Sequence, residues 1–214
     1  MPKRIKNPYL QAVRYAKFGG IPRIDASASR AEIHELIDRH MLARDRLVAK
    51  YAWAIPNRKA LCALAAAAPL VEIGAGNGYW AFLLRQMGVD ILAYDANPPL
   101  GEGHTNEYSR NSLVVGQVWT DVLPGGPEQA ALHADRALFL CWPPSYDPMG
   151  YDALSAYRQA GGRLLAYVGD FTPACGDEAF REALREQWMM IGAITIPRWY
   201  AMKDSLTFWQ PRED

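Results

Sequence analysis

The sequence has little that would point to a metal centre, a disulfide framework or a membrane span. Its cysteines, Cys62, Cys141 and Cys175, are widely separated and match neither a zinc-binding spacing nor a set of paired disulfides. No run approaches the roughly 20 apolar residues of a membrane span, and the first ten residues lack the apolar segment of a secretory signal. The sequence therefore predicts a cytoplasmic protein without a metal or a membrane association.

An excess of charge of one sign is also absent, because the 23 basic and 23 acidic side chains cancel. A balanced chain gives no reason to expect broad affinity for nucleic acid. The first 23 residues are an exception, because they hold no acid but several basic residues, namely Lys3, Arg4, Lys6, Arg14, Lys17 and Arg23. This basic segment is either a solvated terminus or a phosphate-binding arm.

What the sequence does contain is a regular alternation of apolar and amphipathic runs. A charged helix is predicted over 29–50, where Ser29 and Glu32 have the spacing of a capping box. A second helix is predicted from Asn57. We expect a helical N-terminal extension over residues 1–56, followed by one domain over residues 57–214.

That second part has the pattern of a doubly wound α/β domain. Helices are predicted at 77–88, 151–160 and 177–191, between strand-like runs at 69–76, 89–97, 112–118, 136–142, 163–170, 193–200 and 204–211. The strands are apolar throughout, which is typical of a parallel sheet covered on both faces. The last two are too close for a helical crossover and should pair antiparallel. The expected fold is a mostly parallel, seven-stranded sheet with a terminal antiparallel hairpin.

Three glycines alternate behind an acid in the stretch VEIGAGNGYW, residues 71–80. They fall where the first strand turns into the next helix, at the sheet edge where doubly wound folds bind ligands. Glycine allows positive φ angles and close approach of a ligand to the backbone. A dinucleotide fingerprint, G-x-G-x-x-G, would need glycine where Tyr79 stands. Glu72 would repel a pyrophosphate but attract a cation, so the pattern favours a cationic nucleoside over NAD.

The pattern E-x-G-x-G-x-G resembles the first motif of the class I S-adenosylmethionine-dependent methyltransferases, and the likeness extends over about residues 57–210. It implies S-adenosylmethionine over the glycines, with Glu72 near its amino acid end and Asp95 on the ribose hydroxyls. Gln117, in a loop interpreted as following the third strand, would accept a hydrogen bond from the adenine amino group. The implied cofactor-binding residues are Glu72, Gly74, Ala75, Gly76, Asn77, Gly78, Asp95, Ala96, Gln117, Val118, Cys141 and Trp142. A glycine turn without a ligand stays an open alternative.

A second stretch, LFLCWPPSYDP, resembles the amino-methyltransferase motif, in which Asn, Asp or Ser precedes Pro-Pro and an aromatic residue. Here Trp142 precedes Pro143, and Tyr146 comes one place late. Amine methylation of the usual kind is therefore not implied. Ser145, Tyr146 and Asp147 are the candidates for holding or deprotonating an acceptor. The candidates for acceptor binding are Trp142, Pro143, Tyr146, His104 and Asp170.

The sequence thus predicts an S-adenosylmethionine-dependent methyltransferase. Helix 29–50 and the loop 98–112 are expected to fold over the carboxyl edge of the sheet and, with Trp80, Trp142 and Tyr146, to enclose a small-molecule acceptor. His40 is expected on the helix surface. A nucleic acid or protein acceptor, a non-catalytic cofactor-binding partner or sensor, and an NAD-dependent oxidoreductase are the alternatives. Nothing in the sequence defines the methylated atom or an oligomeric state.

Overall fold

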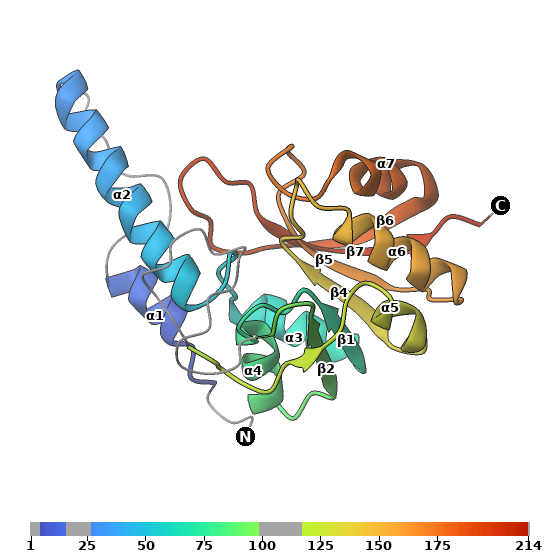
Figure 1. Ribbon diagram of the computed structural model, residues 1–214. Coiled ribbons are helices and arrows are strands. Elements are labelled where there is room, and N and C mark those ends of the chain that lie inside the picture. Colours follow the sequence, from blue (N-terminus) through green and yellow to red (C-terminus); the bar gives the residue numbers. More distant parts are fainter. Residues whose placement is uncertain (1–4, 16–26, 99–116, 214) are drawn as a thin grey trace.

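The computed structural model describes residues 5–15, 27–98 and 117–213. Figure 1 shows a mixed sheet with helices on both faces and one long helix, α2, whose first half projects from the body. The helices are α1 (Pro8–Tyr15), α2 (Arg30–Lys50), α3 (Arg58–Ala66), α4 (Tyr79–Gln86), α5 (Gln129–Leu132), α6 (Met149–Gln159) and α7 (Glu178–Gln187). The strands are β1 (Leu70–Ile73), β2 (Ile91–Asp95), β3 (Leu123–Pro124), β4 (Ala137–Cys141), β5 (Leu165–Gly169), β6 (Trp188–Thr195) and β7 (Ser205–Pro211). Within these described residues, no helix is both long and apolar enough to cross a membrane.

The seven strands form one sheet in the order β3-β2-β1-β4-β5-β7-β6. Only β7 is reversed, because it pairs antiparallel with both β5 and β6, whereas the other neighbouring pairs are parallel. The chain runs outward from β1 to β3 and then returns to β4, so the strand order switches between β1 and β4. The expected doubly wound sheet with a terminal hairpin is confirmed, and its switch point lies directly after the glycine-rich strand.

The two faces of the sheet carry separate apolar clusters. One joins α3 and α4 to residues of α1 and the 51–55 segment, and the other joins α5, α6 and α7. Val71 and Ile73 belong to the second cluster, so the side chain of Glu72, between them in β1, projects to the first. By the same alternation Asp95 lies on the face of Glu72, because Tyr94 before it packs in the second cluster.

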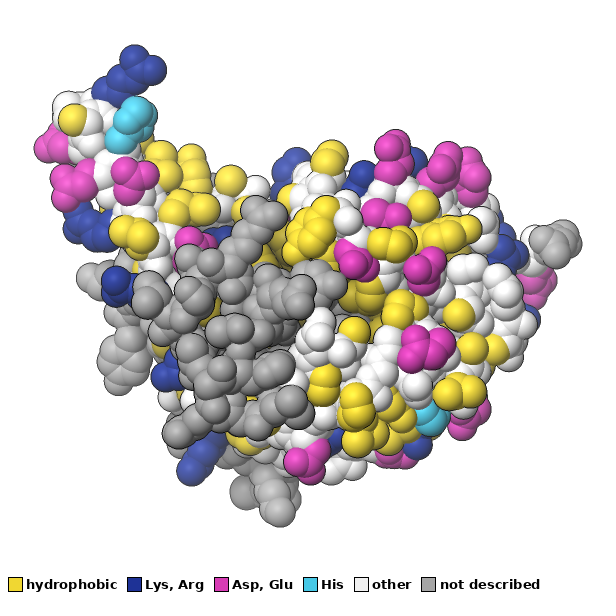
Figure 2. Space-filling model, viewed as in Figure 1, with side chains coloured by type: hydrophobic (Ala, Val, Ile, Leu, Met, Phe, Trp, Pro, Cys, Tyr) yellow, Lys and Arg dark blue, Asp and Glu magenta, His cyan; other side chains and the backbone are white. Residues whose placement is uncertain are grey.

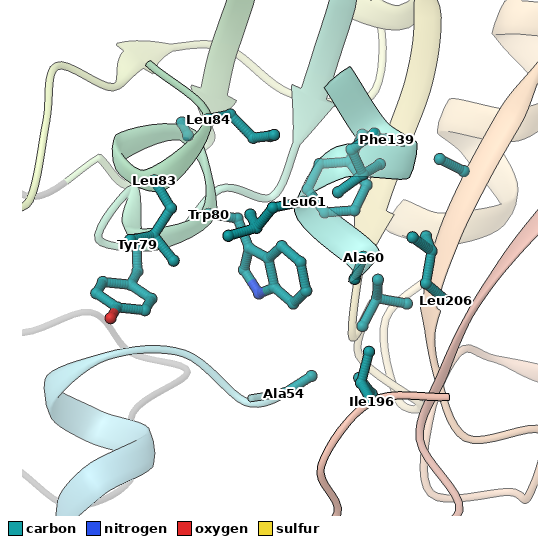
Figure 3. Close-up of a cluster of buried hydrophobic side chains, with 14 of the residues drawn as sticks. Ala54, Ala60, Leu61, Tyr79, Trp80, Leu83, Leu84, Phe139, Ile196 and Leu206 are labelled. Carbon is teal, nitrogen blue, oxygen red and sulfur yellow. The ribbon is translucent and has the colours of Figure 1, made fainter. Parts of the chain in front are cut away.

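The N-terminal segment is part of the first cluster. Tyr9 of α1 is completely buried, stacks on Tyr51 with ring centroids 4.8 Å apart, and accepts a hydrogen bond from Trp199 of the β6–β7 connection. In Figure 3, Ala54 and Ile196 meet the side chains of α3, α4, β4 and β7 around the buried ring of Trp80. Trp80 therefore belongs to the core, and the expectation that it lines a pocket is wrong.

The capping box that the sequence predicted for α2 is confirmed, with Ser29 and Glu32 bonded to each other's backbone amides. The sequence analysis missed α1, although its start carries two ordinary signals. Asn7 accepts a hydrogen bond from the amide of Leu10 as an N-cap residue, and Pro8 stands at the first helical position.

Three other expectations need correction. The run 112–118 was expected to be the third strand; residues 112–116 lie outside the described residues, Gln117 and Val118 are in no strand, and the third strand of the described sheet is β3, further on. An edge strand this short leaves almost no sequence signal. The helix expected to reach residue 191 ends at Gln187, because Trp188 pairs with Pro211 in the sheet. His40 is buried against Trp199, since α2 turns this side toward the β6–β7 connection.

Replacing Tyr9 tests whether the N-terminal segment belongs to the folding core. We expect Tyr9→Ala to lower the free energy of unfolding by about 3–5 kcal/mol, the cost of removing a fully buried aromatic ring. Denaturant titration followed by far-UV circular dichroism measures it. Leu42→Ala is the control: this side chain on α2 is 62% exposed and its loss should change stability by under about 0.5 kcal/mol. Equal changes in the free energy of unfolding for the two substitutions would contradict the packing of Tyr9 in the core.

Candidate functional site

The turn after β1 has the backbone that its glycines predict. Gly74, Gly76 and Gly78 have φ angles of +74°, +56° and +77°, in the region that residues with a side chain rarely adopt. Gly78 is the residue directly before α4. The amide of Ala75 donates to the carbonyl of Tyr94 at 2.9 Å, which ties the turn to β2. The turn is therefore a rigid connection between two strand ends.

The three glycines have different surroundings. A Cβ atom at Gly74 would lie 2.7 Å from the Cε of Met149, and one at Gly78 would lie 2.9 Å from a methyl carbon of Val122. These two glycines allow close packing of the turn against its neighbours. A Cβ at Gly76 would meet no atom of the described residues within 4 Å. As far as these residues go, space beside the backbone is open at Gly76, in the middle of the turn.

Asp95, at the end of β2, holds this turn by hydrogen bonds. Its Oδ2 accepts from the amide of Gly76 at 2.7 Å, and its Oδ1 accepts from the amide of Asn97 at 2.9 Å. Burial raises the pKa of Asp95, and the two hydrogen bonds oppose that rise. Each carboxylate oxygen can accept a further hydrogen bond, so Asp95 can still receive ribose hydroxyls.

Glu72, in β1 two positions before Gly74, is a buried acid with a raised pKa. It is 1% exposed, and its Oε2 has no hydrogen-bond partner among the described residues. Burial raises the pKa of Glu72 to about 8, the charge of Asp95 adds to the rise, and the charge of Arg85 opposes it. A cation bound nearby would supply the missing interaction and favour the ionised form. The buried acid and the open side of Gly76 fit the cofactor that the motif implies.

The carboxyl end of α2 and the segment before β3 close on the same turn. The amide of Trp119 donates to the carbonyl of Asn77 at 3.0 Å, and the side chains of Asn77 and Trp119 both donate to the carbonyl of Lys50. Helix α2 thus reaches the carboxyl edge of the sheet, as expected. Gln117 and Val118 are exposed beside this junction, and precede rather than follow β3; their contact with an adenine stays a prediction. Ala96 is exposed as well.

Trp142, directly after β4, is held in a strained conformation. Its φ of +54° costs on the order of 1–3 kcal/mol for a residue with a side chain. Its amide donates to the carbonyl of Val168 at 2.8 Å, and its Nε1 donates to Asp204 at 2.9 Å. Its ring stacks on Trp53, with centroids 5.4 Å apart and planes 15° apart. These contacts outweigh the strain and fix the indole directly after Cys141, whose thiol has a pKa raised by burial and, to a smaller extent, by the charge of Glu72.

The loop after Trp142 is less enclosed. Tyr146 is 65% exposed, Ser145 is half-buried, and Asp147 accepts from the amide of Met149 at the start of α6. Pro143 is buried and its carbonyl accepts from the amide of Gly176. Their roles in acceptor binding or proton transfer stay predictions.

Two further candidates have different positions. Asp170 is buried, and both of its oxygens accept backbone amides, Oδ1 from Thr172 at 2.9 Å and Oδ2 from Lys203 at 2.8 Å. This links the end of β5 to the β6–β7 connection and leaves acceptor binding by Asp170 as a prediction. His104 lies outside the described residues.

The sequence analysis missed Asp204, which lies just before β7 and is completely buried. Its Oδ1 accepts from Trp142, and its Oδ2 has no partner. Burial raises the pKa of Asp204 to about 6, the charge of Asp170 adds to this, and Trp142 and Arg44 oppose it. No motif includes Asp204, and the only sequence signal is an acid before an apolar strand.

A hollow of about 400 Å³ lies at the carboxyl end of α4, lined among others by Arg58, Cys62 and Arg85. The glycine turn lies at the opposite end of this helix. Among the described residues, the lining of the hollow contains no acid and none of the predicted site residues. The described site residues therefore lie at the carboxyl edge of the sheet and not in this hollow.

The fold and the site together define a Rossmann-like domain with a glycine turn at the switch point of its sheet. Its sheet, with a reversed seventh strand, is the one implied by the resemblance to the class I S-adenosylmethionine-dependent methyltransferases. No family model matches the sequence, and no curated protein matches it significantly.

Three solved structures illustrate the likeness. The magnesium protoporphyrin IX methyltransferase of Synechocystis PCC 6803 with bound SAM is 16% identical, over 97% of this chain and 95% of that one, with a TM-score of 0.43. A mutant of MtNAS in complex with S-adenosylmethionine is 12% identical, over 96% of this chain and 84% of that one, with a TM-score of 0.46. An rRNA methylase of Streptococcus thermophilus is 13% identical, over 72% of this chain and 93% of that one, with a TM-score of 0.41. At such identities and TM-scores the likeness does not extend to activity.

The raised pKa of Glu72 predicts how stability depends on pH. Because its folded pKa of about 8 exceeds the ordinary 4.5, its contribution is complete below pH 4.5 and is lost as pH rises to about 8. The loss is at most about 1.4 kcal/mol per pH unit. Glu72→Gln does not titrate, so its melting temperature relative to wild type should increase between pH 5 and about 8. Thermal melts across this range test it. The exposed control Glu186→Gln should run parallel to wild type; parallel curves for both variants would contradict the raised pKa.

Proposed function

We propose that this protein is an S-adenosylmethionine-dependent methyltransferase. The observation that carries the proposal is the junction of Glu72, Gly76 and Asp95 at the ends of β1 and β2. It combines a buried acid with an unpartnered oxygen, an open face of backbone and a carboxylate fixed by that backbone. A pyrophosphate would face the carboxylate of Asp95, whereas a cationic nucleoside would be attracted by it and would favour the ionised form of Glu72.

Each part of the junction has a binding role in this proposal. Glu72 faces the amino acid end of the ligand, where a positive charge favours its ionised form. Gly76 leaves room for the ligand to lie against the backbone. Asp95, held by Gly76 and Asn97, accepts the ribose hydroxyls through its remaining lone pairs. Because the hydrogen bonds fix Asp95 beforehand, little side-chain freedom is lost on binding.

The bound cofactor supplies a methyl group on a positively charged sulfur; the acceptor's lone pair forms the new bond to carbon while the carbon–sulfur electron pair returns to sulfur. Such a transfer needs mainly alignment and exclusion of water. Near β4 the 54–56 segment is buried, and the stacked rings of Trp53, which is 40% exposed, and Trp142 offer an apolar surface on which an acceptor could be held. A competent nucleophile held against this wall needs no catalytic dyad.

A small molecule is the acceptor that this surface favours. Figure 2 shows acidic and basic side chains interspersed over the described part of one face, without a continuous basic track along it. Nucleic acid would need such a track. The aromatic wall of Trp53 and Trp142 suits a compact, partly apolar molecule instead.

Calorimetric titration with S-adenosylmethionine, S-adenosylhomocysteine and NAD tests the cofactor. We expect the first two to bind, and Asp95→Ala to weaken them by about 1–3 kcal/mol, the cost of unsatisfied buried hydrogen-bond partners. Asp90→Ala is the matched control, because Asp90 precedes the same strand at its other end and its side chain is 64% exposed. Binding of NAD alone would assign the chain to the oxidoreductases, and equal affinities of the two variants would remove Asp95 from the site.

Transfer of a labelled methyl group into a fractionated lysate tests the activity. We expect label in the small-molecule fraction, unchanged when the six basic residues of the first 23 are replaced by Gln. Substitution is the appropriate change, since deleting this segment would remove the core residues Tyr9 and Val13. Label in RNA or DNA that disappears in the substituted protein would instead make the segment a substrate-binding arm. Cofactor binding without any transfer would favour a non-catalytic sensor.

A further inference from the structure

Two buried side chains of opposite charge lie next to the stacked rings of Trp53 and Trp142, and among the described residues each has one atom without a hydrogen-bond partner. Arg44, on the inner side of α2, is 7% exposed, and its Nε has no partner. Asp204, in the β6–β7 connection, is completely buried, and its Oδ2 has no partner. Buried charges are normally retained only when their interactions are complete.

The two charges interact without forming an ion pair. The positive charge of Arg44 lowers the pKa of Asp204 against the effect of burial. The ion pair of Arg44, however, is with its half-exposed neighbour Asp45, at 3.2 Å, and Arg44 is not within 4.0 Å of Asp204. Direct contact would have satisfied both groups. Their separation leaves one open donor and one open acceptor in the same buried region.

A single aromatic wall connects these two groups. The guanidinium of Arg44 lies over Trp53, 5.3 Å from the ring centroid, and Trp53 stacks on Trp142. Trp142 in turn donates to Oδ1 of Asp204 at 2.9 Å. Because Trp142 directly follows β4 at the switch point, this wall adjoins the glycine turn. Its strained backbone indicates that the position of the indole matters.

We propose that Arg44 and Asp204 form an acceptor subsite for an α-amino acid, whose carboxylate binds Arg44 and whose amino group binds Asp204. The substrate class rests on the proposed methyltransferase function, whereas the subsite itself rests on the two charged groups. A simple amine would leave Arg44 unsatisfied, and a simple acid would leave Asp204 unsatisfied. A phosphate would face the charges of both Asp204 and Asp170. Trp142 is a positioning residue that holds Asp204 in place.

The test is calorimetric titration of wild-type protein with each natural amino acid, with and without saturating S-adenosylhomocysteine. We expect at least one amino acid to bind at millimolar concentrations or below. The corresponding amine without the carboxylate and the acid without the amino group should each bind at least about tenfold more weakly, because each leaves one charge unpaired. This comparison uses wild-type protein alone and does not depend on the folding of a variant.

Substitutions then assign the two ends of the ligand. Asp204→Asn should weaken the amino acid, but not the deaminated acid, by at least about tenfold, and Arg44→Gln should weaken the amino acid, but not the amine. The exposed residues Arg46 and Asp135 provide matched controls, Arg46→Gln and Asp135→Asn, which should bind like wild type. Melting temperature and S-adenosylhomocysteine affinity of each variant report on the fold.

The proposal would be overturned if no amino acid bound, or if an amino acid bound no more tightly than the corresponding amine and the corresponding acid. Arg44 and Asp204 would then be two buried charges bridged by water. The same conclusion would follow if both variants bound like wild type. These outcomes are distinct from failure of the proposed function, which would appear as an absence of cofactor binding while amino acid binding persisted.

Discussion

The hydrogen bond from the amide of Gly76 to Asp95 joins the two strand ends on which the candidate site is built. It requires a backbone with positive φ at Gly76, and it brings a carboxylate close to the buried acid Glu72. Two acids on one face of a sheet edge repel each other, and this repulsion contributes to the raised pKa of Glu72. Burial is the larger cause of that rise, and with a pKa of about 8 Glu72 is mostly protonated at neutral pH; a cationic ligand of the kind proposed would favour its ionised form.

The candidate site also depends on the segment of the chain before β1. Tyr51, Ala54 and Ile55 belong to the core cluster of the sheet, and the carbonyl of Lys50 holds both Asn77 and Trp119. The segment thus connects the core to the glycine turn and carries Trp53 to its place on Trp142. Without it the carboxyl edge of β4 would lose one side of its aromatic wall. Residues 1–56 precede the α/β domain in the chain, but their buried side chains pack in the same core as those of α3 and α4.

Much of this could be predicted from the sequence, because the relevant signals are local. Alternating glycines behind Glu72 specify the turn, Ser29 and Glu32 specify a helix start, and apolar runs between helices specify a parallel sheet. What could not be predicted depends on contacts between distant segments. Asp204 gains its importance only because Trp142, 62 residues away, donates to it. His40 looks like a surface residue until α2 is packed on the β6–β7 connection, and β3 is too short to leave a pattern.

The departure at Trp142 is the clearest case of a motif whose meaning changes with the fold. An indole can donate but cannot accept a hydrogen bond, so Trp142 cannot take the place of the Asn, Asp or Ser that the amino-methyltransferase motif has there. What an indole can do is hold a carboxylate, and Asp204 supplies one at 2.9 Å. The hydrogen-bond acceptor missing from the loop after β4 is thus provided by the connection before β7. The backbone carbonyl of Asp204 accepts from Arg198, and the charge of Arg44 lowers the pKa of its carboxyl group, so side chains of α2 and of the β6–β7 connection both act on this acid. In the proposed subsite, Asp204 would compensate for the loss of the local motif, and the acceptor would lie between Asp204 and Arg44 of α2.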